Sequence, residues 1–355
     1  MNSRLLGGLT SREFLRRHWQ KRPLLVRRAL QGALRLLDER ALTALARRDD
    51  VESRIVERRA NRWDTAHGPF RKKFHAKKKN WTLLVSGVNL HLAAADALLR
   101  RFDFVPQARL DDVMVSFASP GGGVGPHVDS YDVFLVQGPG RRRWRISAPG
   151  KSKVQTFIAE PGDLLYLPPG WRHHGVALEP CFTYSIGFRA PRGAELGAAF
   201  LDWLHERGLP DAAYRDAGLS PVKNAALIPG EMVVFVTQLL RRIRWSRADA
   251  QRFLGEYLTL PKAHVVFRPA PAPGRPAPPA RGGSPVRLDP KTRLLYRGNR
   301  FFMNGDTVTV TGRDARWLRN LADQRRASGA PSGRTRIARL LRSWQELGYL
   351  RLERP

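Results

Sequence analysis

The stretch that decides the fold reads Val113-Met-Val-Ser-Phe-Ala-Ser-Pro-Gly-Gly-Gly-Val-Gly-Pro-His127-Val-Asp129-Ser-Tyr-Asp-Val-Phe134. Within it, a short apolar run is followed by a Pro/Gly segment and then by the start of a second run. This is the pattern of two strands joined by a tight connection. His127 and Asp129 lie two residues apart, so on a strand their side chains project from the same face. The stretch therefore predicts β-structure that carries two metal-ligating side chains on one side.

The same pattern continues on the C-terminal side of this stretch, as far as about residue 191. Gly and Pro clusters separate further short apolar runs, which are Val133-Phe-Leu-Val, Trp144-Arg-Ile, Leu164-Leu-Tyr-Leu and Thr183-Tyr-Ser-Ile-Gly-Phe. Many short strands at this spacing predict a β-sandwich or barrel.

Four zones differ in composition, and together they predict an α+β chain. Residues 1–192 form a β-rich domain with an N-terminal extension of helices and strands, in which Ser11 is placed to cap a helix. Residues 193–265 return to helical periodicity and suit a packing or dimerisation segment. Residues 266–286 are a Pro/Gly-rich linker that cannot bury a core. Residues 287–355 alternate strands and helices in the pattern of a small winged-helix-like domain.

The charge balance is strongly positive. The chain of 355 residues has 62 Lys and Arg, of which 51 are Arg, against 31 Asp and Glu, and a formal net charge of +31. Such a field attracts polyanions, and RNA-rich particles are the obvious intracellular ones. A solvated, arginine-rich surface that reflects coding bias explains the composition equally well, so both interpretations stay open.

Several classes of protein are excluded by composition. A single cysteine, Cys181, rules out a disulfide framework and a cysteine-based zinc site. No stretch approaches the roughly 20 apolar residues of a membrane span, and the first residues lack the apolar core of a signal peptide. We therefore expect a protein of the cytoplasm with no membrane association.

A third metal ligand is expected from another strand of the same sheet. The candidates lie in Pro161-Gly-Asp-Leu-Leu-Tyr-Leu-Pro-Pro-Gly-Trp-Arg-His173-His174. Two histidines and one carboxylate form a facial triad that leaves half of an octahedral metal open for a co-substrate and dioxygen. Adjacent side chains on a strand point to opposite faces, so one of His173 and His174 can face the metal. Spacing alone does not choose between them.

A buried cation is predicted in the arginine-rich run from Arg141 to Ile146. Strand alternation groups Arg142 with Trp144 and Ile146 on one face, which is the apolar and hence inward face. A buried guanidinium requires an anion, and arginine pairs with a carboxylate in fork geometry. The open metal positions need a bidentate ligand, and if that ligand is 2-oxoglutarate, its distal carboxylate would need a cation. Arg142 is the candidate for that cation, whereas the arginines at 141, 143 and 145 suit a solvated edge.

These motifs resemble the JmjC-domain 2-oxoglutarate oxygenases, in particular the bacterial ribosomal oxygenase A group. The likeness covers about residues 10–192 and is densest over Pro120–Arg145 and Gly162–Pro191. It implies a double-stranded β-helix core (the cupin or JmjC jelly roll), followed by a helical dimerisation segment and a C-terminal winged-helix-like domain.

Position by position, the resemblance also assigns the site. It places the Fe(II) ligands on His127, Asp129 and His173, and it places the 2-oxoglutarate contacts on Arg142 and Ser116. It further implies a homodimer. The chain departs from the family pattern at Thr183, where an asparagine is expected near the co-substrate.

The activity that the resemblance implies is dioxygenase hydroxylation of a ribosomal protein, at C3 of an arginine in the sixteenth protein of the large subunit. A histidyl protein hydroxylase and a small-molecule cupin oxygenase are the alternatives. A third reading is a nucleic-acid-binding winged-helix protein with a scaffold barrel. A basic surface that touches ribosomal RNA is compatible with the enzyme. For a cationic substrate, Asp132, Asp111 and Asp112 are candidate acids at the mouth of the site.

Overall fold

The computed structural model describes residues 4–30, 35–60, 62–71, 79–269, 285–331, 333 and 335–352. Most of the predicted linker at 266–286 and the lysines between 72 and 78 lie outside these residues. The chain divides into two compact units. One comprises Met1–Ala190, Pro261–Arg293 and Val310–Pro355, and the other comprises Pro191–Leu260 and Leu294–Thr309.

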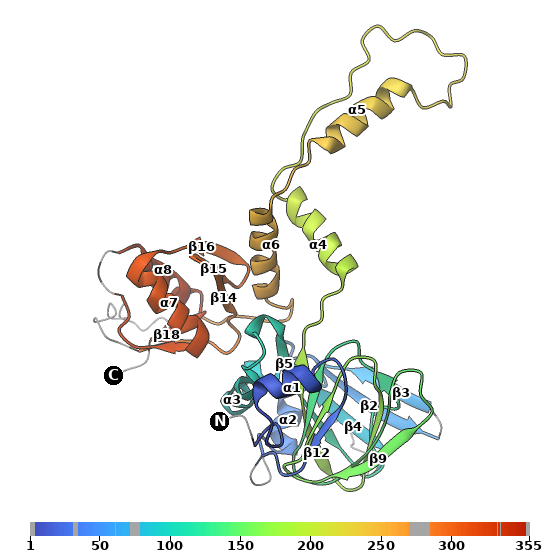
Figure 1. Ribbon diagram of the computed structural model, residues 1–355, viewed down its shortest axis with the longest axis vertical. Helices are drawn as coiled ribbons and strands as arrows, with labels where there is room; N and C mark the ends of the chain where they lie inside the picture. Colours follow the sequence, from blue (N-terminus) through green and yellow to red (C-terminus); the bar gives the residue numbers. More distant parts are fainter. Residues whose placement is uncertain are drawn as a thin grey trace. The chain divides into compact units, whose positions relative to one another are not determined.

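The larger unit is built on an eight-stranded antiparallel sheet in the order β1-β10-β7-β12-β5-β4-β2-β3 (Figure 1). Its strands are β1 (Leu24–Val26), β2 (Ser53–Arg59), β3 (Arg62–His67), β4 (Trp81–Val85), β5 (Leu110–Ala118), β7 (Val133–Gln137), β10 (Leu164–Leu167) and β12 (Cys181–Phe188). The order places strands that are far apart in sequence side by side, with β12 between β5 and β7.

A four-stranded antiparallel sheet in the order β6-β11-β8-β9 packs against one face of the large sheet. Its strands are β6 (His127–Val128), β8 (Arg142–Ser147), β9 (Val154–Ala159) and β11 (Arg172–Ala177). Leu135 and Leu165 of the large sheet form one buried cluster with Trp144 and Ile146 of the small sheet. This two-sheet arrangement is the one that the short, regularly spaced runs predict.

Short helices cover the opposite face of the large sheet (Figure 1). They are α1 (Ser11–Arg17), α2 (Glu39–Leu45), α3 (Ala93–Leu99) and the 3-10 turns η1 (Val88–Leu90), η2 (Arg100–Phe102) and η3 (Gln107–Arg109). The N-cap of α1 is Thr10, so the prediction of Ser11 was wrong by one residue. Thr10 Oγ1 accepts from the backbone of Glu13, whose carboxylate reaches back to Thr10, and this reciprocal pair stabilises the first turn.

The C-terminal part of the same unit holds a three-stranded sheet and two helices. The sheet order is β17-β13-β18, with β13 (Val286–Leu288), β17 (Arg326–Ala327) and β18 (Leu350–Leu352). The helices α7 (Gly312–Gln324) and α8 (Arg336–Glu346) contact these strands. Both helices bury one apolar face, as their amphipathic sequences predict.

The second unit is mainly helical. It contains α4 (Gly193–His205), α5 (Gly230–Arg241) and α6 (Arg247–Thr259), together with a three-stranded sheet of β14 (Leu294–Arg297), β15 (Arg300–Met303) and β16 (Asp306–Thr309). Gly255 on α6 lies against the ring of Phe302, where a Cβ atom would be 2.4 Å from the ring, so the helix approaches β15 closely. α5 buries none of its residues in this unit.

Among the residues that the structure describes, no helix combines the length and the apolar content that spanning a bilayer requires.

Candidate active site

The small sheet brings His127 and His173 together. The two residues are direct partners in the β6–β11 pair, so their side chains leave the sheet on the same face. Asp129 follows β6 by one residue, and its backbone carbonyl accepts a hydrogen bond from Gly170 N at 2.9 Å. The Pro-Pro-Gly turn before β11 is thereby tied to the His-X-Asp segment.

The three side chains form a compact donor set. Nε2 of His127 is 3.8 Å from Asp129 Oδ1, and Nε2 of His173 is 3.6 Å from Asp129 Oδ2. One ligand atom from each residue lies within 4.8 Å of the others. These are nitrogen and carboxylate donors of the kind that bind Fe(II) in a facial triad.

Backbone carbonyls orient both histidine rings. His127 Nδ1 donates to Gly125 O at 3.1 Å, and His173 Nδ1 donates to Trp171 O at 3.0 Å. A proton on Nδ1 leaves the Nε2 lone pair free for a metal. Gly125 adopts a φ of +81°, a conformation that favours glycine, so the Gly-rich segment contributes the turn that presents this carbonyl.

The charge state of His173 also suits a metal ligand. Burial, together with the neighbouring His127, lowers the pKa of His173 below its usual range. The imidazole is therefore neutral at pH 7, which is the form that coordinates metal.

His174 points away from this cluster. It is paired with Arg145 on the outward-facing positions of β11 and β8, and its ring meets Trp63 edge-on at 6.0 Å. His173 is therefore the histidine that shares a face with His127, which settles the geometric question that spacing left open.

Arg142 is buried between the sheets, as strand alternation predicts. It is 4% exposed, whereas Arg143 and Arg145 on the same strand are exposed. Its Nη2 contacts Cys181 Sγ at 3.7 Å, and its Nε has no hydrogen-bond partner among the described residues. A buried guanidinium with an unsatisfied donor fits a carboxylate ligand.

Polar side chains from the large sheet face the same interior. Ser116 and Thr183 are direct partners on β5 and β12, and both are buried. Ser116 Oγ donates to Thr183 O at 3.3 Å, and Thr183 Oγ1 donates to Gln137 Oε1 at 3.5 Å. The residue that departs from the family pattern is thus the neighbour of the predicted co-substrate serine.

Asp132 is not at the mouth of the site, so that prediction was wrong. It is fully buried and accepts hydrogen bonds from Tyr166 Oη at 2.7 Å, Gln20 Nε2 at 3.1 Å and Arg109 Nη2 at 3.3 Å. Alternation turns Asp132 away from Asp129 and into the core beneath the helices, where these donors satisfy the carboxylate. Its role is structural.

Asp111 and Asp112 lie at a β-bulge. In the β5–β12 pair, Ile186 is opposite Val113 and Phe188 is opposite Leu110. Gly187 is the single β12 residue between these pairs, so it lies opposite both Asp111 and Asp112. Bulges re-aim side chains and are common next to active sites. Both carboxylates line a small, partly open cavity of about 30 Å³.

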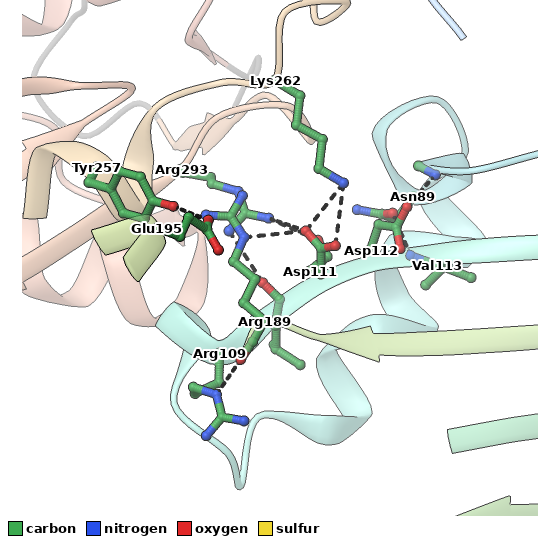
Figure 2. Close-up of polar contacts among 12 residues, drawn as sticks. Asn89, Arg109, Asp111, Asp112, Val113, Arg189, Glu195, Tyr257, Lys262 and Arg293 are labelled. Carbon is green, nitrogen blue, oxygen red and sulfur yellow. Dashed lines mark hydrogen bonds and ion pairs between the residues drawn. The ribbon is translucent and has the colours of Figure 1, made fainter. Parts of the chain in front are cut away.

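The two acids differ in their partners. Figure 2 shows three cations directed at Asp111 and none of them bonded to Asp112. The distances to Asp111 are 3.3 Å from Arg189 Nε, 3.3 Å from Lys262 Nζ and 3.8 Å from Arg293 Nη2. Although burial opposes it, these cations keep the pKa of Asp111 below its usual value. Asp111 is thus a charged, saturated carboxylate.

Asp112 is the less satisfied acid of the pair. Its Oδ2 accepts from Gly87 N at 2.7 Å, and burial together with the charge of Asp111 raises its pKa. A cation beside Asp112 would lower that pKa again. Tyr131 is influenced by both Asp129 and Asp112, and burial and Asp129 raise its pKa to about 12.

The sequence did not identify the cations that surround Asp111. Arg189, Lys262 and Arg293 are separated from Asp111 by about 80 to 180 residues and carry no local motif. Their convergence depends on tertiary structure, and a long-range pairing of this kind leaves no signal in one sequence.

Comparison with known proteins places the chain in a family. The JmjC domain model matches residues 97–156 and 150–196, and the ROXA-like winged helix model matches residues 242–351. The chain is 37% identical over 324 residues to the ribosomal protein uL16 3-hydroxylase of Escherichia coli, covering 85% of this chain and 86% of that protein. The chain belongs to the JmjC-domain ribosomal oxygenases.

Further relatives agree with this membership. Human ribosomal oxygenase 1 is 27% identical over 207 residues, which cover 48% of this chain and 31% of that protein. The structure of the E. coli ribosomal oxygenase YcfD with cobalt and 2-oxoglutarate superposes with a TM-score of 0.81 at 31% identity, covering 98% of this chain and 99% of that one.

Membership in the ribosomal oxygenases confirms the jelly-roll fold with a winged helix, the oxygenase activity, and the dependence on Fe(II) and 2-oxoglutarate. The winged-helix match begins at residue 242 and so includes α6. The individual site residues and the domain boundaries stay predictions. The residues present fit the cofactors, because the donor set is His-Asp-His and the buried Arg142 has an unsatisfied donor.

The two adjacent histidines give a direct test of the metal site. We expect His173→Ala to weaken Co²⁺ binding at least about 100-fold, because it removes one of three donors. His174→Ala, the matched control, should leave the affinity unchanged. Titration calorimetry with Co²⁺ would measure both variants, and equal losses would contradict the assignment of His173. Because its pKa is lowered, His173 should hold metal until the pH falls below the ordinary imidazole range.

Proposed function

We propose that this ribosomal oxygenase hydroxylates C3 of an arginine in large-subunit ribosomal protein uL16. The observation that carries the proposal is the similarity along most of both chains to an enzyme with that activity. Asp112 accepts one backbone hydrogen bond, from Gly87 N, and has a raised pKa, and a carboxylate of this kind supports a cationic substrate side chain. Such a substrate places the protein with ribosomes in the cytoplasm.

In this proposal His127, Asp129 and His173 hold Fe(II), and Arg142 with Ser116 holds the far carboxylate of 2-oxoglutarate. Fe(II), 2-oxoglutarate and dioxygen together supply the oxidising chemistry, which inserts one oxygen atom into a C–H bond and yields succinate and CO₂. The protein contributes position and environment. The apolar cluster of Leu135, Trp144 and Ile146 excludes water beside the polar interior.

Asp112 would hold the substrate guanidinium. Asp111 is already neutralised by three cations, so it has little to offer a further one. Asp112 has a raised pKa and faces the same cavity, and a guanidinium there would convert it fully to the carboxylate. Arginine binds a carboxylate through parallel N–H groups, which would also fix the orientation of its carbon chain.

The homodimer predicted from residues 193–265 is part of the proposal. Apolar side chains of the helical unit are widely exposed, including Leu227 (71%), Ile228 (68%), Val233 (54%) and Leu240 (59%). Val233 and Leu240 are seven residues apart on α5 and so share one face of that helix, and an exposed apolar helix face suits an interface. A second copy of the same helix is the occupant we propose. The contact with ribosomal RNA expected from the basic composition stays a prediction.

The activity can be tested by intact mass spectrometry of purified ribosomal proteins incubated with the enzyme, Fe(II), ascorbate and 2-oxoglutarate. We expect one large-subunit protein to gain the mass of one oxygen atom, and fragmentation to place it on an arginine. His127→Ala should abolish the gain. A modified histidine would instead identify a histidyl hydroxylase. Succinate formation without any modified ribosomal protein would indicate another substrate.

The proposed role of Asp112 predicts that removing its charge weakens binding of a peptide that contains the target arginine. Asp112→Asn should raise KM for a uL16 peptide about tenfold or more, because a charged hydrogen bond is lost. A peptide with citrulline in place of the arginine should bind the wild type and the variant equally weakly. Glu52→Gln, which changes another acid of the same cavity, is the control. If both variants lose equally, Asp112 has no special role. Because its pKa is raised, wild-type affinity should increase with pH above the ordinary carboxyl range.

The proposed dimer predicts that introducing acidic residues on α5 lowers the mass of the particle in solution from that of a dimer to that of a monomer. Light scattering of the wild type should give twice the 40.1 kDa mass of one chain. Val233→Glu with Leu240→Glu should yield monomers, because the buried charges would be unpaired. Gln238→Glu on the same exposed helix is the control and should stay dimeric. A monomeric wild type would refute the dimer without affecting the catalytic assignment.

A further inference from the structure

A threonine of the large sheet carries a buried hydroxyl group that has no hydrogen-bond partner. Thr82 on β4 is 0% exposed, and its Oγ1 is unpaired among the residues that the structure describes. A buried polar group that is left unpaired costs free energy, whereas a valine of nearly the same shape would avoid that cost. Thr82 is therefore a position at which a bound molecule would satisfy a need that the fold leaves open.

Strand register directs this hydroxyl into the space between the two sheets. Trp81 and Leu83, the neighbours of Thr82 on β4, belong to the apolar cluster beneath the helices, so Thr82 points to the opposite face. Thr82 is the direct partner of Ala118 on β5, and directly opposite residues share a face. Ser116 is two residues before Ala118 on β5. Thr82 therefore shares the inner face of the sheet with the serine that is predicted to hold the co-substrate.

Arg142 reaches the same region from the small sheet. Ala118 is directly opposite Cys181 of β12, and Nη2 of Arg142 contacts Cys181 Sγ at 3.7 Å. Ala118 and Cys181 pack together with Ala177, which is the direct partner of Arg142 in the β11–β8 pair. Thr82 and Arg142 therefore flank one cluster of small, buried side chains.

The two unpaired groups beside this cluster can both donate to an anion. Nε of Arg142 can only donate, and the hydroxyl of Thr82 can donate as well as accept. Adjacent strands are about 4.8 Å apart, so the backbones of Thr82 and Cys181, two strands apart, are separated by about 10 Å. A carboxylate has two oxygens that accept hydrogen bonds, and it carries the charge that a buried guanidinium requires. One such group would satisfy both donors.

We propose that Thr82 donates a hydrogen bond to the distal carboxylate of 2-oxoglutarate, beside Arg142. This inference rests on the proposed function, in which Arg142 and Ser116 hold that carboxylate, and it adds a third group from a strand that carries no other predicted site residue. The guanidinium of Arg142 supplies the charge, and the uncharged hydroxyl of Thr82 supplies direction. Thr82 thereby favours a 2-oxo acid with a second carboxylate over one without it.

Calorimetric titration of 2-oxoglutarate into the full-length, Co²⁺-loaded protein tests this role without turnover. We expect Thr82→Val to weaken binding at least about tenfold, because a hydrogen bond to a charged group is lost. Thr82→Ser keeps the hydroxyl and should bind close to the wild type. The matched control is Thr156→Val, which makes the same change at an exposed position of β9 and should leave the affinity unchanged.

A ligand without the distal carboxylate tests which part of the co-substrate Thr82 contacts. 2-Oxopentanoate has the chain length of 2-oxoglutarate, and its affinity, measured by competition, should be equally low in the wild type and in Thr82→Val. A parallel loss of affinity for both ligands would overturn the proposal, because Thr82 would then act through the shape of the pocket. Wild-type affinity for 2-oxoglutarate in Thr82→Val would also overturn it, in favour of a water molecule as the partner of the hydroxyl.

Thermal melting distinguishes a binding role from a folding defect. Without 2-oxoglutarate, Thr82→Val should melt at or above the wild-type temperature, because it removes an unpaired buried hydroxyl. With 2-oxoglutarate, its melting temperature should rise less than that of the wild type. A lower melting temperature of the free variant would show that the hydroxyl is already paired in the free protein, which contradicts the proposal.

Arg142→Gln, with its folding verified by the same melt, separates this inference from the proposed function. If Arg142→Gln binds 2-oxoglutarate as tightly as the wild type, the assignment of Arg142 to the distal carboxylate fails, and the role of Thr82 fails with it. If Arg142→Gln loses binding and Thr82→Val does not, the assignment of Arg142 stands and only the role of Thr82 is refuted. Losses in both variants support both.

Discussion

Two hydrogen bonds from histidine side chains to backbone carbonyls determine the geometry of this site. Gly125 O and Trp171 O each accept a hydrogen bond from the Nδ1–H of a histidine, and this directs the Nε2 atoms of His127 and His173 toward Asp129. Without these carbonyls the rings could rotate or take the other tautomer, and three donors would not face one point. The Gly-rich segment and the Pro-Pro-Gly turn are therefore as much a part of the site as the side chains they orient.

The space between the two sheets is divided by strand alternation. On one side, Leu135, Trp144 and Ile146 exclude water. The other side is lined by polar side chains that are nevertheless buried, each at most 5% exposed: Arg142, Ser116 and Thr183. Burying a cation is costly unless an anion accompanies it. The Nε of Arg142, which has no hydrogen-bond partner among the described residues, is therefore consistent with the proposed role of Arg142 in binding a carboxylate.

Alternation made much of this predictable from the sequence. It identified Arg142 as the inward arginine and limited the third donor to one of two histidines, and the resemblance then selected His173. It failed at Asp132, because period two gives the face of a side chain and not what packs on that face. It also could not resolve Asp111 from Asp112, since a bulge shifts the register by one residue and sequence contains no sign of it. The start of α1 shows a similar limit: the sequence pattern located the beginning of the helix but selected Ser11 as the N-cap, whereas Thr10 is the N-cap in the structure.

The arginine excess has more than one origin in the fold, and burial distinguishes them. Arg293 donates to Leu110 O and Asp111 O, and burial lowers its pKa to about 10, so it stays charged at pH 7 while it fixes the chain to β5. Arg325 similarly bonds Thr292 O and Asp289 O. Such arginines hold segments of the chain together and do not offer their guanidinium groups to a partner at the surface. Arg287, Arg326 and Arg351 are exposed and lie directly opposite one another on three neighbouring strands. Net charge does not separate these two groups of arginines, whereas burial and strand register do.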